Sequence, residues 1–598
     1  MAASTSPILW KRPPAHWILP PATGSKAAQL ESALSLSALV ARVLANRGFD
    51  VASAERFLSP GLDGLHDHYL MRDMKPAVTR LWKAVEAREP VLLYGDYDVD
   101  GTTSVVVLKK AIDILGGCAT FHIPHRLKDG YGMRGEVIDV AAREGVRLIV
   151  SVDTGIRASE VVRHAQAMGI DVIVTDHHLP ERELPPALAV LNPNRPECGY
   201  PNKNLCGAGV ALKLVQALLQ RSGMADARRA AMLDSFLKPV AIATVADIVP
   251  LTGENRVIVQ RGLSGMRLVK NAGLRALMTA AGLDEGEPPS THQVAFRLAP
   301  RINAAGRMAT AQDVIELFLT QDESRAKEIA ENLDSLNRER QRVEAEIVEL
   351  VLKQCEEMAG VADQAAFVFA GDDWHLGVLG IGACRLVERL CRPVFVLSNS
   401  SSTDESLGPH LSGSGRSIAA FHLLGALETM PELFAKFGGH RQAAGVTLPA
   451  FQLAEFQRRF QEHAAGVLTA DDRRPIFTAD AEAAFSEFTD RGVEQLQRLG
   501  PFGFGNAAPL FYVSGAEVAG PAKALTEGKH FNVPLRHAGR MLFCKAWNFG
   551  ERVELFEPGA KLDLLVQVDE DAYSRKRGYS PWCVVLKDAR RAAAQLIR

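Results

Sequence analysis

The chain has 598 residues, of which 47% are hydrophobic and 23% charged, a composition that indicates a globular protein of roughly four domains. Its formal net charge of −2 excludes a chain that holds nucleic acid by overall basic charge, so such contacts must come from local basic patches. No uninterrupted apolar stretch approaches the length of a membrane span, so we expect no membrane partner.

Residues 1–50 are predicted to be an N-terminal extension, with helical spacing of apolar residues from Ala33 to Phe57. Residues 1–21 contain no apolar core of signal-peptide length. The eight cysteines are scattered without a C-x-x-C pair, which argues against a disulfide framework or a structural zinc site. Both observations fit a reducing compartment, and we expect a cytoplasmic protein.

Strands alternate with helical stretches between residues 90 and 192, which predicts a mostly parallel sheet in an α/β domain at residues 51–265. The expected strands are Val91–Tyr94, Ala119–Ile123, Leu148–Val152, Val172–Thr175 and Ala187–Leu191.

A long helix is predicted from Thr320 onward, within a connecting segment at residues 266–360. Thr320-Gln321-Asp322-Glu323 has the spacing of a capping box. Apolar residues then recur at alternating four- and three-residue steps, and Arg340 interrupts the series. We interpret this narrow stripe as a connector packed on its neighbours rather than an isolated coiled coil.

Two further domains are expected after this helix. Residues 361–468 are predicted to form a second α/β domain, and Ser398–Ser406 within it is expected to be a solvated loop. Residues 469–598 are richer in short strands separated by glycine-rich turns, which predicts a small β-barrel. The strands expected in the second α/β domain are Ala366–Ala370, Pro393–Ser398 and Ala444–Leu448. Those expected in the barrel are Leu510–Ser514, Phe531–Leu535, Leu562–Val568 and Trp582–Leu586.

Four acidic clusters lie where strands or helices of the first domain are predicted to end. In an open α/β sheet, the crevice outside the carboxyl ends of the strands is where ligands bind. Carboxylates and imidazoles gathered there would repel or stay unsatisfied unless cations held them, and two divalent ions would do so. The clusters are Asp96-Tyr97-Asp98-Val99-Asp100, Ser151-Val152-Asp153, Asp176-His177-His178 and Ala246-Asp247.

The residue types in these clusters suggest separate roles. Asp96 and Asp98 can each hold a different ion, and Asp153, alone after an apolar run, suits a bridging position. His177 supplies a nitrogen ligand and Asp247 another oxygen. Oxygen ligands with one imidazole suit Mn²⁺ or Mg²⁺ better than a thiolate-preferring metal.

Two such ions about 3.5–4 Å apart clamp the attacking and leaving oxygens of an in-line displacement. The clusters therefore predict a metal-dependent hydrolase of phosphate esters. His178 is left to contact the phosphate or protonate the leaving oxygen, whereas Asp176 and Asp100 are expected to be supporting residues. Each motif alone has another interpretation, because Ca²⁺ loops share D-x-D-x-D, and Asp247 alone could cap a helix.

At these residues the chain resembles the DHH phosphoesterase superfamily, named for the triplet present here at Asp176-His177-His178. More narrowly it resembles the RecJ family of single-strand-specific exonucleases, from about residue 50 to the C-terminus. The resemblance implies a DHH domain, a DHH-associated domain and an OB-fold nucleic-acid-binding domain. It also implies that Asp153 bridges two ions and that His178 faces the substrate phosphate. The implied metal ligands are Asp96, Asp98, Asp153, His177 and Asp247.

Two further segments resemble substrate motifs of this family. Arg301 and Arg307 flank Asn303 in Arg-Ile-Asn-Ala-Ala-Gly-Arg, and their guanidinium groups suit bidentate phosphate contacts. The segment that contains Gly439 and His440 resembles the glycine-histidine signature of the DHH-associated domain. Paired glycines let a backbone approach phosphate closely, and the histidine could touch the scissile group.

A third segment is predicted to bind an anion. Ser412-Gly413-Ser414-Gly415-Arg416-Ser417 precedes an apolar stretch, Ile418–Leu427, that has helical character. Free N–H groups at a helix start, small hydroxyls and an arginine together favour phosphate. By resemblance, this region recognises a 5′-terminal phosphate with help from Arg126, and Tyr131 lies in the same family segment as Arg126.

The C-terminal barrel is expected to bind single-stranded nucleic acid through a basic groove and through aromatic side chains that stack on the bases. The candidate segments are Lys529-His530-Phe531 and Arg575-Lys576-Arg577, with Tyr573 and Tyr579 beside the second.

Together these features predict a 5′-to-3′ exonuclease that acts on single-stranded DNA in repair and recombination and releases nucleoside 5′-monophosphates. The resemblance alone implies single-strand-binding protein and a repair helicase as partners. One alternative is a DHH-type pyrophosphatase or a phosphodiesterase of short oligonucleotides. The pyrophosphatase branch carries a histidine four residues before the first aspartate, where this chain has Leu92. Another alternative is a non-catalytic DNA-binding scaffold, which the intact carboxylates and both histidines disfavour.

Overall fold

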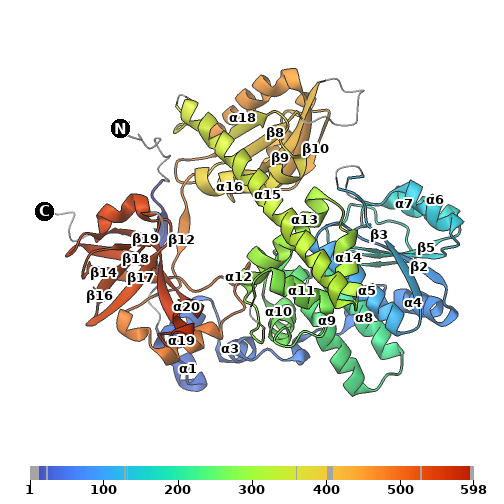
Figure 1. Ribbon diagram of the computed structural model, residues 1–598, viewed down its shortest axis with the longest axis horizontal. Coiled ribbons are helices and arrows are strands. Elements are labelled where there is room, and N and C mark those ends of the chain that lie inside the picture. Colours follow the sequence, from blue (N-terminus) through green and yellow to red (C-terminus); the bar gives the residue numbers. More distant parts are fainter. Residues whose placement is uncertain are drawn as a thin grey trace. The chain divides into compact units, whose positions relative to one another are not determined.

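The chain divides into two compact units in a computed structural model (Figure 1). The larger unit contains Leu65–Pro250 and Val257–Arg474, and the smaller contains Ala15–Gly64, Leu251–Arg256 and Pro475–Arg598. The described residues are 13–21, 24–126, 129–130, 132–283, 285–358, 360–399, 409–525 and 528–592, without the side chains of 572–573. Tyr131 and the predicted loop beyond residue 399 lie outside them.

A five-stranded parallel sheet forms the first part of the larger unit, in the order β3-β2-β4-β5-β6. The predicted parallel sheet is confirmed, and all five residues of β4 are buried, as in a sheet covered on both faces. The strands are β2 (Pro90–Tyr94), β3 (Cys118–His122), β4 (Leu148–Val152), β5 (Asp171–Thr175) and β6 (Ala189–Leu191).

Helices connect these strands, and further helices follow the last strand of the sheet (Figure 1). Helix α5 packs against α8 and α9, so the segment after β2 is held by a helical layer. The helices are α4 (Met74–Ala87), α5 (Val99–Ile114), α6 (Gly135–Arg143), α7 (Ser159–Ala167), α8 (Gly207–Arg221), α9 (Asp226–Ala246), α10 (Gly253–Gly265), α11 (Ala272–Ala280), α12 (Thr291–Gln293), α13 (Ala299–Met308) and α14 (Gln312–Leu319).

The predicted long helix is α15 (Glu323–Glu357), which packs on α11, α13 and α16 (Leu376–Leu390). Its cap differs from the prediction, because Asp322 rather than Thr320 accepts the N–H bonds of Ser324 and Arg325, at 2.8 and 3.3 Å. An aspartate one residue before the helix reaches these donors directly. Arg340, which interrupts the apolar stripe, is buried and donates to Glu344 over 2.9 Å.

A second sheet, in the order β10-β11-β9-β8-β7, completes the larger unit. The segment Ser412–Arg416 is part of strand β9, paired with β8 on one side and β11 on the other, so the prediction of free N–H groups at a helix start was wrong. The small residues serve packing, since a Cβ at Gly415 would lie 2.5 Å from the Phe395 ring. The elements are β7 (Phe367–Gly371), β8 (Val394–Ser398), β9 (His410–Arg416), α17 (Leu423–Leu427), β10 (Lys436–Gly439), β11 (Ala443–Pro449) and α18 (Leu453–Val467).

The smaller unit is built on the predicted barrel. Strand β14 pairs with both β18 and β16, and β16, β17, β19 and β18 complete a closed ring. Helices α1 (Ser25–Leu34), α2 (Ala38–Asn46) and α3 (Val51–Leu58) contribute to the barrel's core. The strands are β14 (Phe511–Val518), β16 (Phe531–His537), β17 (Arg540–Ala546), β18 (Lys561–Glu570) and β19 (Trp582–Arg591). Short strands β1 (His16–Ile18), β12 (Ile476–Thr478), β13 (Ala481–Glu482) and β15 (Lys523–Ala524) lie beside them.

The sequence predicted neither a membrane span nor a disulfide framework. Among the residues that the structure describes, no helix combines the length and apolar character needed to cross a bilayer. All eight cysteines lie in the described ranges, and each is a free thiol.

Candidate metal centre

The four acidic clusters meet at the carboxyl-terminal edge of the parallel sheet. Asp96 and Asp98 follow β2, Asp153 follows β4, the two histidines follow β5, and Asp247 caps the end of α9. Their ligand atoms form three groups, each with all atoms within 4.8 Å of one another. The groups are Asp96, Asp98 and Asp153; Asp153, His177 and His178; and Asp100, His177 and Asp247.

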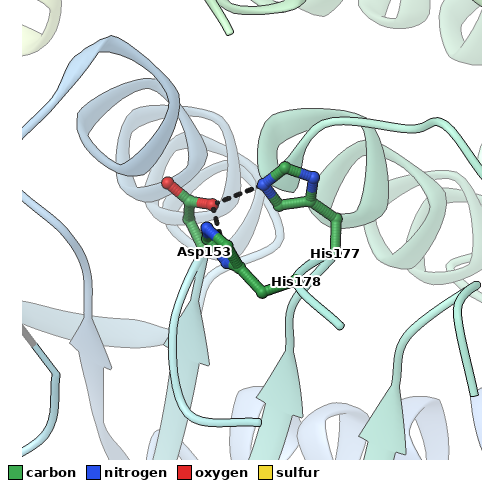
Figure 2. Close-up of side chains that lie close together, drawn as sticks. All are labelled: Asp153, His177 and His178. Carbon is green, nitrogen blue, oxygen red and sulfur yellow. Dashed lines mark ion pairs between the residues drawn. The ribbon is translucent and has the colours of Figure 1, made fainter. Parts of the chain in front are cut away.

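Asp153 lies at the middle of this arrangement, with both imidazoles turned toward its carboxylate (Figure 2). His177 Nε2 is 3.2 Å from Asp153 Oδ1, and His178 Nδ1 is 4.0 Å from the same oxygen. His177 Nε2 also lies 3.7 Å from Asp100 Oδ2 and 3.7 Å from Asp247 Oδ2. One imidazole therefore faces three carboxylates.

The backbone of Asp153 is bent to reach this position. Its φ is 60°, in the left-handed region that non-glycine residues seldom adopt, while its N–H still donates to Thr175 O over 2.9 Å. Gly207 packs closely beside it, since a Cβ there would lie 2.7 Å from the Asp153 Cβ. Such strain is typical of functional positions that the surrounding structure holds in place.

The buried carboxylates repel one another. Burial, followed by the charge of Asp98, raises the pKa of Asp96 well above its usual range. Burial, then Asp100 and its neighbours, does the same to the pKa of Asp153. Burial and the charges of Asp100 and Asp98 raise the pKa of Asp247 to about 9. A cation among these groups would favour their ionised forms.

The donor set fits a divalent ion. Asp96 Oδ1 and Asp247 Oδ2 are buried and have no hydrogen-bond partner within the described ranges. Burial lowers the pKa of His177, which keeps its imidazole neutral and able to act as a ligand. Several carboxylate oxygens with imidazole nitrogen match the preference of Mn²⁺ and Mg²⁺.

Asp176 supports the two histidines from the strand end. Its Oδ1 accepts hydrogen bonds from His178 Nδ1 and from the His177 N–H, both at 2.7 Å, and its Oδ2 accepts from the Ile156 N–H at 3.0 Å. Although burial raises the pKa of Asp176, these bonds, that of His178 foremost, bring it below its ordinary value. Burial lowers the pKa of His178, but Asp176 outweighs it and the net shift is upward. These contacts fix the orientation of His178.

Asp100 joins the centre to the helical layer. Its two oxygens accept the N–H groups of Gly207 and Ala208 at 2.5 and 2.8 Å, at the start of α8. Because Asp100 also belongs to the group with His177 and Asp247, the structure places this predicted supporting residue at ligand distance.

The Arg301–Arg307 motif forms helix α13, and part of it contacts the metal-ligand segment. Asn303 Oδ1 accepts the Val99 N–H at 3.2 Å, at the start of α5. The Arg301 guanidinium instead donates to Asp334 over 2.9 Å and to Arg297 O over 2.6 Å. These contacts give Arg301 and Asn303 structural partners in the fold, and their contact with phosphate stays a prediction.

A substitution at Gly306 would test whether helix α13 positions the metal-ligand segment. A Cβ there would lie 2.5 Å from Tyr97 O, between the two metal-ligand aspartates of the first cluster. Gly306→Ala should therefore displace this segment and weaken Mn²⁺ binding by at least about tenfold, measured by titration calorimetry. Gly466→Ala on α18 is the matched control, because a Cβ there meets nothing within 4 Å. Unchanged Mn²⁺ affinity in Gly306→Ala would show that α13 does not position the centre.

Arg307 lies in a cluster of positive charge. Burial and the charges of Arg126, Arg340 and Arg416 lower its pKa to about 10. Its Nη1 donates to Gly377 O over 2.9 Å, and Arg416 Nη1 donates to Ser414 Oγ over 2.7 Å. Positive charges that act on Arg307 in this way favour an anion beside it.

Gly439, from the predicted glycine-histidine motif, serves packing in the fold. Gly439 has a φ of 149°, and a Cβ there would lie 2.3 Å from Ala443 O. The next residue, His440, is close enough to the metal centre that the charges of Arg157 and His178, after burial, lower its pKa. The structure therefore brings His440 and the histidine pair into the same region of the larger unit.

The structure of the barrel contradicts the predicted contact of Phe531 with a DNA strand. Phe531 is 2% exposed and packs on Phe556 with ring centroids 5.1 Å apart, so it belongs to the core. On β17, by contrast, Phe543 is 58% exposed, and Trp547 beyond the strand is 44% exposed. Burial alternates along Arg540–Ala546, but Met541–Cys544 is an unbroken apolar run, so the sequence alone does not signal which of these side chains point outward. Tyr579 is exposed as expected.

Comparison with known proteins assigns the family. Models of the DHH family N-terminal domain, the DHHA1 domain and the RecJ OB domain match residues 90–244, 363–466 and 479–580. The single-stranded-DNA-specific exonuclease RecJ of Bacillus subtilis (strain 168) is 35% identical over 563 residues, 94% of this chain and 69% of that protein. The chain belongs to the RecJ family. RecJ of Escherichia coli (strain K12) is 36% identical over 490 residues, 80% of this chain and 83% of that protein.

A solved RecJ structure has the same fold. RecJ in complex with Mn²⁺ from Thermus thermophilus aligns with a TM-score of 0.81 at 28% identity, over 96% of this chain and 80% of that one. The family resemblance and the fold class predicted from the motifs are both confirmed.

Proposed function

We propose that this RecJ-family chain hydrolyses single-stranded DNA from the 5′ end and releases nucleoside 5′-monophosphates. The observation that carries the proposal is the convergence of Asp96, Asp98, Asp153, His177 and Asp247 at one edge of the sheet. The relatives are named single-stranded-DNA-specific exonucleases, which favours an active enzyme over a scaffold or a short-oligonucleotide phosphodiesterase.

The residues of the metal centre would have separate roles in the reaction. The five ligands would hold two divalent ions, Mn²⁺ or Mg²⁺, with Asp153 between them. Such ions, when bound, supply an activated water and stabilise charge on the phosphate. His178, oriented by Asp176 at 2.7 Å, contacts the phosphate or protonates the leaving oxygen.

Polarity would come from the arginine cluster. Arg126, Arg307 and Arg416, with Ser414, form a site for the 5′-terminal phosphate, and His440 approaches the scissile group. The Arg126 guanidinium carbon lies 4.3 Å above the Tyr97 ring, beside the metal-ligand segment. A terminal phosphate held there would place the first phosphodiester bond near the ions, which makes the enzyme an exonuclease.

The barrel would also bind the single strand. Phe543 on β17, the third strand of the barrel in chain order, and Trp547 just after that strand present aromatic faces. OB folds bind oligonucleotides on the face of their second and third strands. Arg575, Lys576 and Arg577 add positive charge at the end of the short helix α20 (Ala572–Lys576), between β18 and β19. We further propose a cytoplasmic role in DNA repair, with single-strand-binding protein and a helicase as partners.

The deciding experiment is digestion of end-labelled strands. With Mn²⁺ or Mg²⁺, the protein should shorten single-stranded DNA from the 5′ end, release mononucleotides and leave duplex intact. Equal digestion of strands blocked at the 5′ end and at the 3′ end would refute the polarity, and activity after chelation would refute the metal requirement.

The phosphate site makes a separate prediction. Arg416→Ala should raise KM for a 5′-phosphorylated strand by about tenfold or more, since a hydrogen bond to a charged group contributes about 1.5–3 kcal/mol. A 5′-hydroxyl strand should be cleaved equally by both proteins. Arg458→Ala is the control, because Arg458 lies on α18 and pairs with Glu455 and Glu462. Equal losses on both strands would remove Arg416 from the phosphate site.

A further inference from the structure

Ile248 has a backbone conformation that its side chain disfavours. It follows the last residue of helix α9 and its cap, Asp247, and its φ is 58°. Helices commonly end with one left-handed residue, but that residue is usually glycine. A residue branched at Cβ is an outlier there. Of the positive-φ residues in the described part of the chain, Ile248 alone is β-branched.

The fold gains little from this isoleucine. Its side chain is 67% exposed, so most of its apolar surface is not buried in the protein. Its N–H donates to Val245 O over 3.4 Å, a bond that glycine would form equally well. Neither burial nor hydrogen bonding in the fold therefore explains why a strained, β-branched residue is present.

The position of Ile248 suggests what it contacts. It adjoins Asp247, whose Oδ2 lies 3.7 Å from His177 Nε2 in the metal centre. On the other histidine segment, Leu179 follows His178 and is 63% exposed, with its carbonyl held by Arg157 at 3.1 Å. Two exposed aliphatic residues thus directly follow residues of the metal centre in the chain.

We propose that Ile248 is a substrate-contacting residue that packs against the nucleoside whose phosphate is held at the metal centre. This inference rests on the proposed hydrolysis of a DNA strand. Every nucleoside has an apolar sugar edge and a base face, so an aliphatic contact is independent of sequence. It would orient the terminal nucleotide, while the neighbouring carboxylate acts on its phosphate.

The test is Ile248→Gly. Glycine relieves the backbone strain, so the thermal midpoint should stay the same or rise, and Mn²⁺ affinity should not change. Loss of the apolar contact should raise KM for a single strand, and the dissociation constant for a non-hydrolysed strand, by about tenfold. Ile248→Asn, which tolerates the left-handed conformation, should give the same loss of binding.

Arg88→Gly is the matched control. Arg88 ends helix α4 with a φ of 50° and precedes β2, at the opposite edge of the sheet from the metal ligands. It should change neither KM nor strand binding. Wild-type KM and strand affinity in Ile248→Gly would overturn the inference, and so would a lower thermal midpoint, because the side chain would then belong to the fold. A wild-type protein that binds strands through Ile248 but never cleaves them would overturn the proposed function alone.

Discussion

Asp153→Asn should abolish hydrolysis of single-stranded DNA, with kcat lowered at least about 10³-fold, because a bridging ligand contributes several kcal/mol to transition-state stabilisation. Asparagine is the informative substitution, since it keeps the side-chain shape and tolerates the φ of 60° at this position. Strand binding should remain near wild type, because the exposed aromatic and basic residues of the barrel are unchanged. The measurements are single-turnover cleavage and fluorescence anisotropy with a labelled strand.

Two observations would separate a bridging role from a general loss of structure. Titration with Mn²⁺ should show fewer bound ions in Asp153→Asn than in the wild type. Asp139→Asn is the matched control, because Asp139 is an exposed carboxylate that pairs with His164 at 2.7 Å on α6 and α7. Near wild-type cleavage by Asp153→Asn would exclude it as the bridging ligand.

The centre was predictable because its residues follow simple local rules. Asp153 comes directly after a buried apolar strand, and Asp96 and His177 come two residues after one. Parallel strands bring their carboxyl ends to one edge. Asp247 follows a helix instead, and was included because it forms a fourth acidic cluster at the end of an element. Residue type and position along the chain therefore sufficed to predict which side chains meet at this edge, and their role as metal ligands stays a prediction.

The contacts around the centre were less predictable, because residues far apart in the sequence become hydrogen-bond or strand partners only in the folded chain. Arg301 offers the same donors to a phosphate or to Asp334, and only the fold places Asp334 at 2.9 Å. Strand β9 lacks the β-branched residues typical of strands. It forms because β8 and β11 bond it on both sides and its glycines let Phe395 pack. The strain at Ile248 leaves no trace in sequence at all, since φ follows from the way α9 ends.

Protein stripped of divalent ions should become less stable as pH rises from about 4 toward 9. The pKa of Asp247 is raised from the ordinary 3.8 to about 9, and those of Asp96 and Asp153 are raised well above that ordinary value. Between these limits the folded protein keeps protons that the unfolded chain has released, so stability falls as pH rises. Each pKa unit corresponds to about 1.4 kcal/mol, so the loss should be readily measurable in urea unfolding at pH 5, 7 and 9.

Mn²⁺ should reverse this dependence. Ion binding displaces the retained protons, so Mn²⁺ affinity and its stabilising effect should both increase with pH over the same window. The metal-free Asp153→Asn protein should be more stable than metal-free wild type at pH 9 although it is inactive, because one repelling charge is gone. A metal-free wild type whose stability is flat or rises across this window would contradict the repulsion on which the metal centre is argued. Agreement would show that the carboxylates are held together at a cost in stability that only bound cations offset.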